Sequence, residues 1–220
     1  MISVAVFDLD GILVDSEQVW DDARRSLAAA RGIPWPDEAT HAMIGMSSPE
    51  WSRYMHEEVG LPERAEEVNR EVVAWMERLY RAELPVIDGA VEAVRRLGGE
   101  LRLGLASSSN RPVIDLVLEL TGLGDAFEAT VSSEEVGRGK PAPDVYLEAL
   151  RRLGVGGSEA VAIEDSHSGI RAAHAAGMRV VAIPNPHFPP AAEALALADV
   201  VLESIAELST DVARGGTFQA

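Results

Sequence analysis

The sequence contains no cysteine, so neither disulfide bonds nor thiolate metal ligands contribute to its fold or chemistry. Lysine is almost as scarce: of the 19 basic residues, 18 are arginine and only Lys140 is a lysine. Because arginine is used at every other such position, the single lysine indicates a site that needs a compact ammonium group rather than a planar guanidinium.

Long hydrophobic runs are also missing, and the first residues lack the basic and apolar regions of a signal peptide. We therefore expect a cytoplasmic protein with no membrane partner. The net charge of −17 argues against nucleic acid as a partner as well, and a phosphate substrate would need local positive charge. At 220 residues and 47% hydrophobic content, the chain is long enough for one domain plus a small insert, and we expect a monomer or weak homodimer.

Short apolar runs alternate with helical patterns of about ten residues along most of the chain. This alternation predicts an α/β fold with a doubly wound parallel sheet, in which ligands bind beyond the carboxyl ends of the strands. The predicted strands are Val4–Phe7, Leu101–Ala106, Phe127–Val131, Val161–Ile163 and Val180–Ile183, and the helices between them are Gly89–Leu97, Pro112–Leu120, Pro143–Leu153 and Gly169–Ala176.

The alternation is interrupted once, after the first strand, by a stretch without any strand signal. It predicts four helices, Glu17–Arg31, Asp37–Met43, Pro49–Val59 and Pro62–Ala82, separated by glycine and proline. We therefore expect an α/β core formed by residues 1–15 and 85–220 and a small helical cap formed by residues 16–84. The expected hinges are Val14–Ser16 and Leu84–Ile87.

Two carboxylates follow the first predicted strand, in the sequence Asp8-Leu9-Asp10-Gly11. In an extended segment Asp8 and Asp10 point the same way, and two such charges are unfavourable unless a cation or proton joins them. Oxygen ligands of this kind suit Mg²⁺, and Gly11 allows a sharp turn beside them. Taken alone, the same residues also fit an ordinary turn that follows a strand.

Polar residues also follow two later predicted strands, Leu101–Ala106 and Val161–Ile163, and a lysine precedes the predicted helix Pro143–Leu153. Ser107-Ser108-Ser109-Asn110 suits a phosphate oxygen but also an N-cap, and Glu164-Asp165 suits a metal but also an exposed helix start. Lys140 lies in a loop of glycine and proline that would serve equally as a surface turn. Their common position at the carboxyl edge of the sheet favours one site containing acids, a hydroxyl and an ammonium group.

With these motifs the sequence resembles the haloacid dehalogenase superfamily. The similarity covers essentially the whole chain, including the position of the cap, and the subgroup that it resembles contains β-phosphoglucomutases and 2-deoxyglucose-6-phosphate-type phosphatases. It rests on Asp8-Leu9-Asp10-Gly11, Ser107, Gly137-Arg138-Gly139-Lys140-Pro141, and Glu164-Asp165-Ser166 followed by Gly169-Ile170.

The resemblance implies a Mg²⁺-dependent phosphatase acting through an aspartyl-phosphate intermediate. Asp8 would be the nucleophile and Asp10 the general acid and base, while Ser107 and Lys140 would hold the transferring oxygens. The metal ligands would be Asp8, the backbone carbonyl of Asp10, Asp165 and, directly or through water, Glu164. The residues expected to contact the substrate are Leu9, Gly11, Glu17, Trp20, Met46, Ser108 and Asn110.

Departures from the mutases favour hydrolysis of a small phosphomonoester, a sugar or polyol phosphate first. Trp20 occupies the position at which the mutases have a histidine that supports acid–base catalysis. In the cap turn Gly45-Met46-Ser47-Ser48, Ser48 occupies the position of the mutase arginine that binds the second phosphate of a bisphosphate. Phosphonatases use a lysine of the cap, and the predicted cap of this chain has none. The original dehalogenases lack an aspartate at the position that Asp10 occupies here. A phosphosugar mutase and a non-catalytic binding protein on the same fold remain as alternatives.

Overall fold

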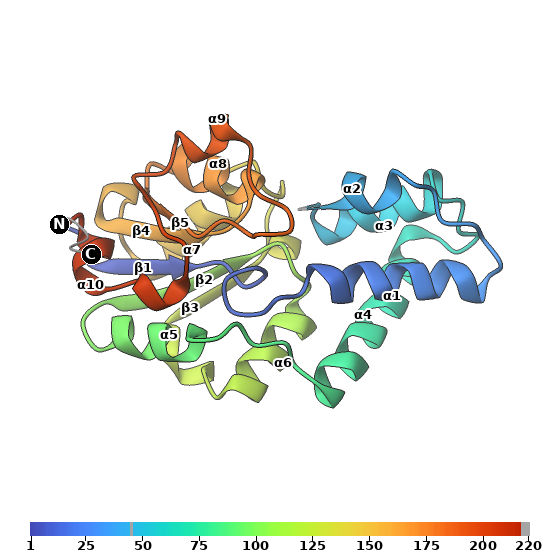
Figure 1. Ribbon diagram of the computed structural model, residues 1–220, viewed down its shortest axis with the longest axis horizontal. Helices are drawn as coiled ribbons and strands as arrows, with labels where there is room; N and C mark the ends of the chain where they lie inside the picture. The colour runs from blue at the N-terminus through green and yellow to red at the C-terminus, as the bar shows by residue number, and fades with distance from the viewer. Residues whose placement is uncertain (45, 217–220) are drawn as a thin grey trace.

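The computed structural model describes residues 1–44 and 46–216, and a six-stranded sheet lies at its centre (Figure 1). Its order is β3-β2-β1-β4-β5-β6, and every pair of neighbours is parallel. The strands are β1 Val4–Phe7, β2 Arg102–Ser107, β3 Ala129–Ser132, β4 Ala160–Glu164, β5 Arg179–Ala182 and β6 Val200–Val201. The order reverses between β1 and β4, so a ligand site is expected at their carboxyl ends.

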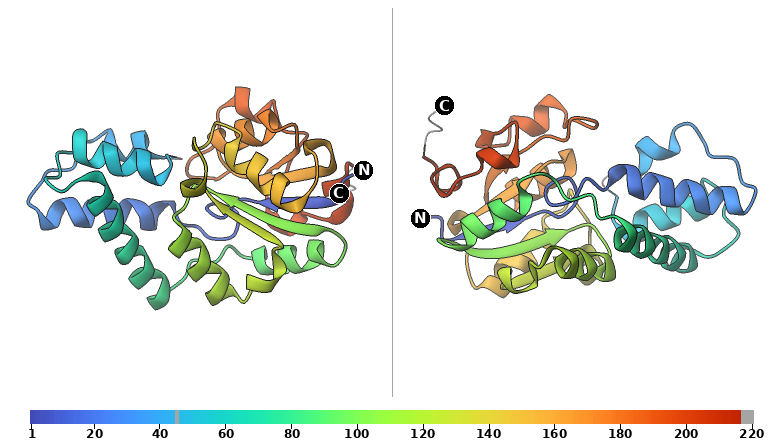
Figure 2. Two further views of the ribbon diagram at one scale, coloured as in Figure 1. Left: turned by 180° about the vertical axis from the view of Figure 1, so that it is seen from behind. Right: turned by 60° about the horizontal axis from the view of Figure 1, so that its bottom comes forward.

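Helices cover both faces of this sheet, which confirms the predicted doubly wound fold (Figures 1 and 2). Side chains of β1 alternate between the faces: Ala5 and Phe7 belong to the core formed with α5 and α6, and Val4 and Val6 to the core formed with α7 and α8. The helices of this part are α5 Ala90–Gly98, α6 Arg111–Thr121, α7 Asp144–Leu153, α8 His167–Ala175, α9 Ala192–Leu195 and α10 Thr210–Arg214, with 3₁₀ turns at Gly124–Ala126, Ser133–Glu135, Gly157–Glu159 and Ile205–Glu207.

Four helices between β1 and α5 lie beyond the carboxyl ends of the strands (Figures 1 and 2). They are α1 Glu17–Ala30, α2 Ala39–Met43, α3 Ser48–Glu57 and α4 Ala65–Ala82, and they bury apolar side chains such as Trp51 and Met76 between them. The two chain segments that join them to the sheet run antiparallel, with Asp15 N donating to Pro85 O at 2.9 Å and Ile87 N to Leu13 O at 3.0 Å. The assignment of residues 16–84 as a separate cap, hinged at these segments, remains our proposal.

The predicted strands and helices are all present, the strands within two residues and the helices within three residues of the expected ends. The sequence did not indicate β6, α9 or α10. These elements are two to five residues long, too short to produce a measurable period in the sequence. Among the described residues, no helix combines the length and the apolar character needed to cross a membrane.

Candidate active site

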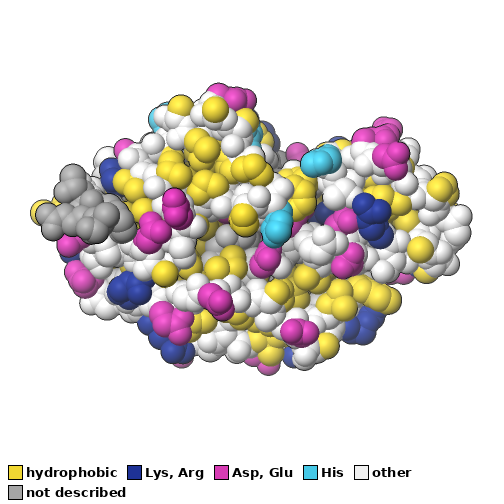
Figure 3. Space-filling view, viewed as in Figure 1, with side chains coloured by type: hydrophobic (Ala, Val, Ile, Leu, Met, Phe, Trp, Pro, Cys, Tyr) yellow, Lys and Arg dark blue, Asp and Glu magenta, His cyan; other side chains and the backbone are white. Residues whose placement is uncertain are grey.

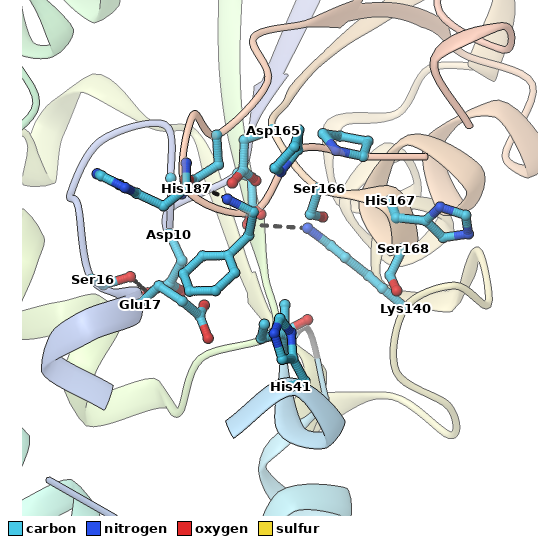
Figure 4. A pocket seen from close by; sticks show the side chains of 18 residues that line it. Asp10, Ser16, Glu17, His41, Lys140, Asp165, Ser166, His167, Ser168 and His187 are labelled. Atoms are coloured by element: carbon cyan, nitrogen blue, oxygen red, sulfur yellow. Dashed lines mark hydrogen bonds and ion pairs between the residues drawn. The ribbon is translucent and has the colours of Figure 1, made fainter. Parts of the chain in front are cut away.

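A cavity of about 470 Å³ opens where the carboxyl ends of β1 and β4 face the helices α1 and α2. Asp10, Lys140 and Asp165 point into it from the sheet side, and His41 of α2 borders it from the other side (Figure 4). The surface view shows acidic side chains spread over the visible face and histidine side chains at the junction of the two parts (Figure 3). The cavity is thus enclosed jointly by the sheet and the inserted helices.

Asp8, at the end of β1, is buried at the floor of this cavity and held by two donors. Its Oδ1 accepts a hydrogen bond from Leu9 N at 2.8 Å and lies 3.0 Å from Lys140 Nζ. The pKa of Asp8 is raised to about 8, chiefly by burial; Lys140 lowers it, and the nearby Glu164 and Asp10 raise it. Without a further cation, the negative charges of the buried carboxylates at this site therefore repel one another.

Asp10 accepts hydrogen bonds on both carboxylate oxygens. Ser16 Oγ and Trp20 Nε1 donate to Oδ1 at 2.5 and 3.2 Å. Ser109 Oγ and Ser107 Oγ donate to Oδ2 at 2.6 and 3.4 Å. The carboxylate is thus fixed by groups from the start of α1 and the end of β2, and it faces the cavity.

Lys140, the only lysine, is buried between two carboxylates. Its Nζ lies 3.0 Å from Asp8 Oδ1 and 2.6 Å from Glu164 Oε1, and 5.0 Å from the ring centre of Tyr146. Burial disfavours its charge, but Asp8 and Glu164 outweigh burial and raise the pKa of Lys140 above its ordinary value. Lys140 therefore provides a permanent positive charge at the floor of the cavity.

Glu164 is fully buried and uses both oxygens within the protein. Oε1 accepts from Lys140 Nζ and from Tyr146 OH, both at 2.6 Å. Oε2 accepts from Asp165 N at 3.0 Å and from Ser166 N and Oγ at 3.2 and 3.1 Å. Since a carboxylate offers about four lone-pair directions and Glu164 accepts five hydrogen bonds, it is saturated without any ligand.

Asp8, Glu164 and Asp165 place one carboxylate oxygen each within 4.8 Å of one another. Asp165 lines the cavity, and among the described residues no donor is hydrogen-bonded to its side chain. Burial, with Glu164 and Asp8 nearby, raises its pKa well above the ordinary value. Gly11 leaves room for this side chain, because a Cβ at Gly11 would lie 1.9 Å from Asp165 Oδ2. A buried oxygen-only donor set with unused carboxylate oxygens fits a hard divalent cation such as Mg²⁺.

Most of the predicted substrate contacts also border the site. Gly11, Glu17 and Ser108 line the main cavity, while Trp20 and Met46 line a small pocket beside it. The side chain of Leu9 is buried in the core, and its N–H is donated to Asp8. Ser107 is fully buried and reaches Asp10. Gly45, in the predicted cap turn, lies outside the described residues.

Asn110, like Leu9, lines neither pocket. It accepts a hydrogen bond from Ser48 Oγ at 2.7 Å and donates to Asn69 Oδ1 at 3.0 Å and Glu134 Oε1 at 2.7 Å. Ser48 and Asn69 belong to the inserted helices α3 and α4. Asn110 therefore joins the end of β2 to those helices.

Sequence reasoning missed other residues of the cavity. His187 and Phe188, in the segment between β5 and α9, line the cavity, and the ring of Phe188 lies 6.2 Å from that of His41 of α2, edge to face. His167, the first residue of α8, is half-buried and also lines the cavity. The one available signal was that the segment Pro184–Pro190 follows the carboxyl end of a strand.

Comparison with known proteins places this site in a family. The model of the haloacid dehalogenase-like hydrolases matches residues 2–177. Hexitol phosphatase B of Escherichia coli (strain K12) is 36% identical over 215 residues, which cover 94% of this chain and 95% of that protein. The crystal structure of CbbY from Rhodobacter sphaeroides in complex with phosphate superposes with a TM-score of 0.82 at 27% identity, covering 94% and 96% of the two chains. A β-phosphoglucomutase from Clostridium difficile shares the fold, with a TM-score of 0.82 at 24% identity and coverage of 97% and 96%.

Proposed function

Because this chain belongs to the haloacid dehalogenase-like hydrolase family, we propose that it is a Mg²⁺-dependent phosphatase that hydrolyses a sugar or polyol phosphate through an aspartyl-phosphate at Asp8. The observation that carries this proposal is the contact of Asp8 with Lys140 at 3.0 Å, within an acidic cluster at the floor of a cavity. A nucleophilic carboxylate beside a fixed ammonium and a metal site is suited to phosphoryl transfer.

In the proposed first step the Asp8 carboxylate attacks phosphorus, a new O–P bond forms and the ester O–P bond breaks. Lys140 holds Asp8 in place and faces the phosphoryl oxygens, while Ser108, just after β2, borders the same space. Ser107, at the end of β2, is fully buried and supports Asp10 from behind. The burial of Lys140 supports a strong interaction, because water does not screen its charge.

The proposed role of Asp10 is to give a proton to the leaving alkoxide and later to take one from the water that hydrolyses the aspartyl-phosphate. Ser16, Trp20 and Ser109 fix its two oxygens at the cavity wall. This positioning supports a role at the ester oxygen rather than at phosphorus, because Asp8 already occupies the cavity floor.

Mg²⁺ would be held by Asp8, Asp165 and the backbone carbonyl of Asp10, and it would neutralise negative charge on the phosphoryl group. Glu164 is proposed to act through water and through Lys140, because its oxygens already accept several hydrogen bonds from the protein. With Lys140, the cation would supply the local positive charge that a chain of net charge −17 otherwise lacks.

Trp20 and the name of one relative support a sugar or polyol phosphate as the substrate. Trp20 donates to Asp10 from the position where the mutases have a histidine, and hexitol phosphatase B is a relative over nearly the whole chain. The cavity volume suits a small molecule, and the net charge disfavours nucleic acid. We further propose a cytoplasmic enzyme that acts as a monomer or weak homodimer.

The test is phosphate release with Mg²⁺ from a panel of sugar, polyol, glycolate and nucleotide monophosphates. We expect the highest kcat/KM among the sugar and polyol phosphates. If no ester in the panel is hydrolysed, the proposed function is wrong and a non-catalytic role gains support. If β-glucose 1-phosphate is isomerised in the presence of a bisphosphate, the enzyme is a mutase.

A further inference from the structure

A small side pocket of about 60 Å³ extends from the main cavity towards the inserted helices. The two spaces share Asp10, Glu17 and Ser108, so the side pocket begins at the proposed general acid. Its remaining walls are apolar or aromatic apart from one arginine and one serine: Trp20, Arg24, Met43, Met46, Trp51 and Ser109. A leaving group bound at Asp10 would therefore reach this pocket with its far end.

Arg24 of α1 has an unusual environment for an arginine. It is only 5% exposed, and its guanidinium carbon lies 5.4 Å from the ring centre of Trp20 and 5.2 Å from that of Trp51. Among the described residues, no group accepts a hydrogen bond from its buried Nε. Buried polar groups of proteins almost always have such a partner. Nε itself is covered by protein, but the two Nη groups also have no acceptor among the described residues, and Arg24 lines the side pocket, so they indicate a position for a ligand there.

Glu17 is the carboxylate near Arg24 whose oxygens remain available to accept a hydrogen bond. Among the acids whose charge acts on Arg24, Asp21 accepts from Arg25 and Thr40, and Asp10 is held by its serines and Trp20. The side chain of Glu17 has no hydrogen-bond partner among the residues that the structure describes, and it lines both spaces. A free guanidinium donor and a free carboxylate acceptor thus border the same pocket.

We propose that Arg24 is a specificity-determining residue that, with Glu17, binds a hydroxyl group of a neutral polyhydroxylated leaving group, remote from the phosphoester. A hydroxyl accepts from Arg24 and donates to Glu17 at once, which a carboxylate or second phosphate cannot do. An anionic leaving group would also meet the charges of Glu17 and Asp10. The faces of Trp20 and Trp51 offer apolar surface for C–H groups of the carbon chain. This inference rests on the proposed phosphatase activity.

The experiment compares three esters: sorbitol 6-phosphate, phosphoglycolate and p-nitrophenyl phosphate. They carry a hydroxylated, an anionic and an aromatic leaving group respectively. The variant Arg24→Met keeps the side-chain length and the apolar contact with both tryptophans while removing the donors. Arg78→Met is the matched control, because Arg78 also stacks on a tryptophan, Trp75, at 4.8 Å but lies outside both pockets.

For Arg24→Met we expect the ratio of kcat/KM for sorbitol 6-phosphate to that for p-nitrophenyl phosphate to fall about tenfold to a hundredfold, mainly through KM. The ratio should stay unchanged in Arg78→Met. An equal loss on all three esters would overturn the proposal, because it would mark Arg24 as structural. A wild-type preference for phosphoglycolate that disappears in Arg24→Met would overturn it too, because Arg24 would then bind an anion.

If Arg24→Met does not fold, Glu17→Met carries the same test, since it removes the carboxylate acceptor at similar side-chain length and leaves the arginine in place. The selectivity ratio should again fall, and an unchanged ratio would contradict the proposal. Failure of the underlying function is distinguishable. In that case the wild-type protein with Mg²⁺ releases phosphate from none of the three esters.

Discussion

The carboxylate of Glu164 lies directly against the Cα of Gly169, so that a Cβ at Gly169 would lie 1.8 Å from Oε1. This contact lies between the end of β4 and the first turn of α8. It holds Glu164 Oε1 where it accepts hydrogen bonds from Lys140 and Tyr146. Gly169→Ala should push Glu164 aside and misplace Lys140, and kcat should fall roughly a hundredfold. His174→Ala, on the exposed side of α8, is the control. A wild-type kcat for Gly169→Ala would show that this contact does not matter to the site.

Gly139 makes a similarly close contact between the Lys140 loop and the inserted helices. A Cβ there would lie 2.7 Å from Ser47 Cβ, at the start of α3, whereas a Cβ at Gly137 would lie 3.7 Å from its nearest neighbour, Asp144 Oδ1. We expect Gly139→Ala to hold the helices away from the site and lower kcat/KM about tenfold, and Gly137→Ala to have little effect. Steady-state kinetics of both variants test this, and equal effects would argue against the contact.

Lys140→Arg should lower kcat about a hundredfold or more. The Lys140 side chain is 2% exposed and lies within 3.0 Å of two carboxylates, which leaves no space for the wider guanidinium. Circular dichroism would establish that the variant is folded before its rate is measured. Activity close to that of the wild type would refute the argument from the single lysine.

The response of stability to Mg²⁺ should depend on pH. In the metal-free protein burial raises the pKa of Asp8 from 3.8 to about 8, so the folded state holds a proton that the unfolded chain has released. The contribution of Asp8 to the free energy of unfolding therefore falls as pH rises between about 4 and about 8. A bound cation stabilises the ionised carboxylate, so Mg²⁺ should raise Tm more at about pH 8 than at about pH 5. Thermal unfolding with Mg²⁺ or with EDTA measures this, and an equal effect at both pH values would contradict it.

The sheet and the family could be predicted from the sequence because their signals are local. The strands contain short apolar runs, such as Val4–Phe7, and the acids Asp8 and Glu164-Asp165 stand directly at the ends of two of them. The family assignment is confirmed by the match over residues 2–177. The meeting of Asp8 with Glu164 and Asp165 follows from topology, since β1 and β4 are neighbours in the sheet.

Contacts between distant segments could not be read in the same way. The hydrogen bond from Ser48 to Asn110 depends on how the inserted helices lie on the sheet, which no period in the sequence encodes. The same holds for Phe188 beside His41 of α2 and for Tyr146, which reaches Glu164 from α7, a helix that packs against β2 and β3. Nothing in the sequence distinguishes Arg24 from a surface arginine of a helix, yet it is buried beside Trp20 and Trp51.

Identification of the phosphorylated residue during turnover tests the central claim most directly. Enzyme and Mg²⁺ are mixed with an ester that the enzyme hydrolyses, and the reaction is quenched in acid. Borohydride then reduces any acyl phosphate to an alcohol, and peptide mass spectrometry identifies the residue that carries it. We predict the modification on Asp8 alone and none in Asp8→Asn, which should fold but lose turnover. Modification of another residue, or rapid turnover by Asp8→Asn, would contradict the account.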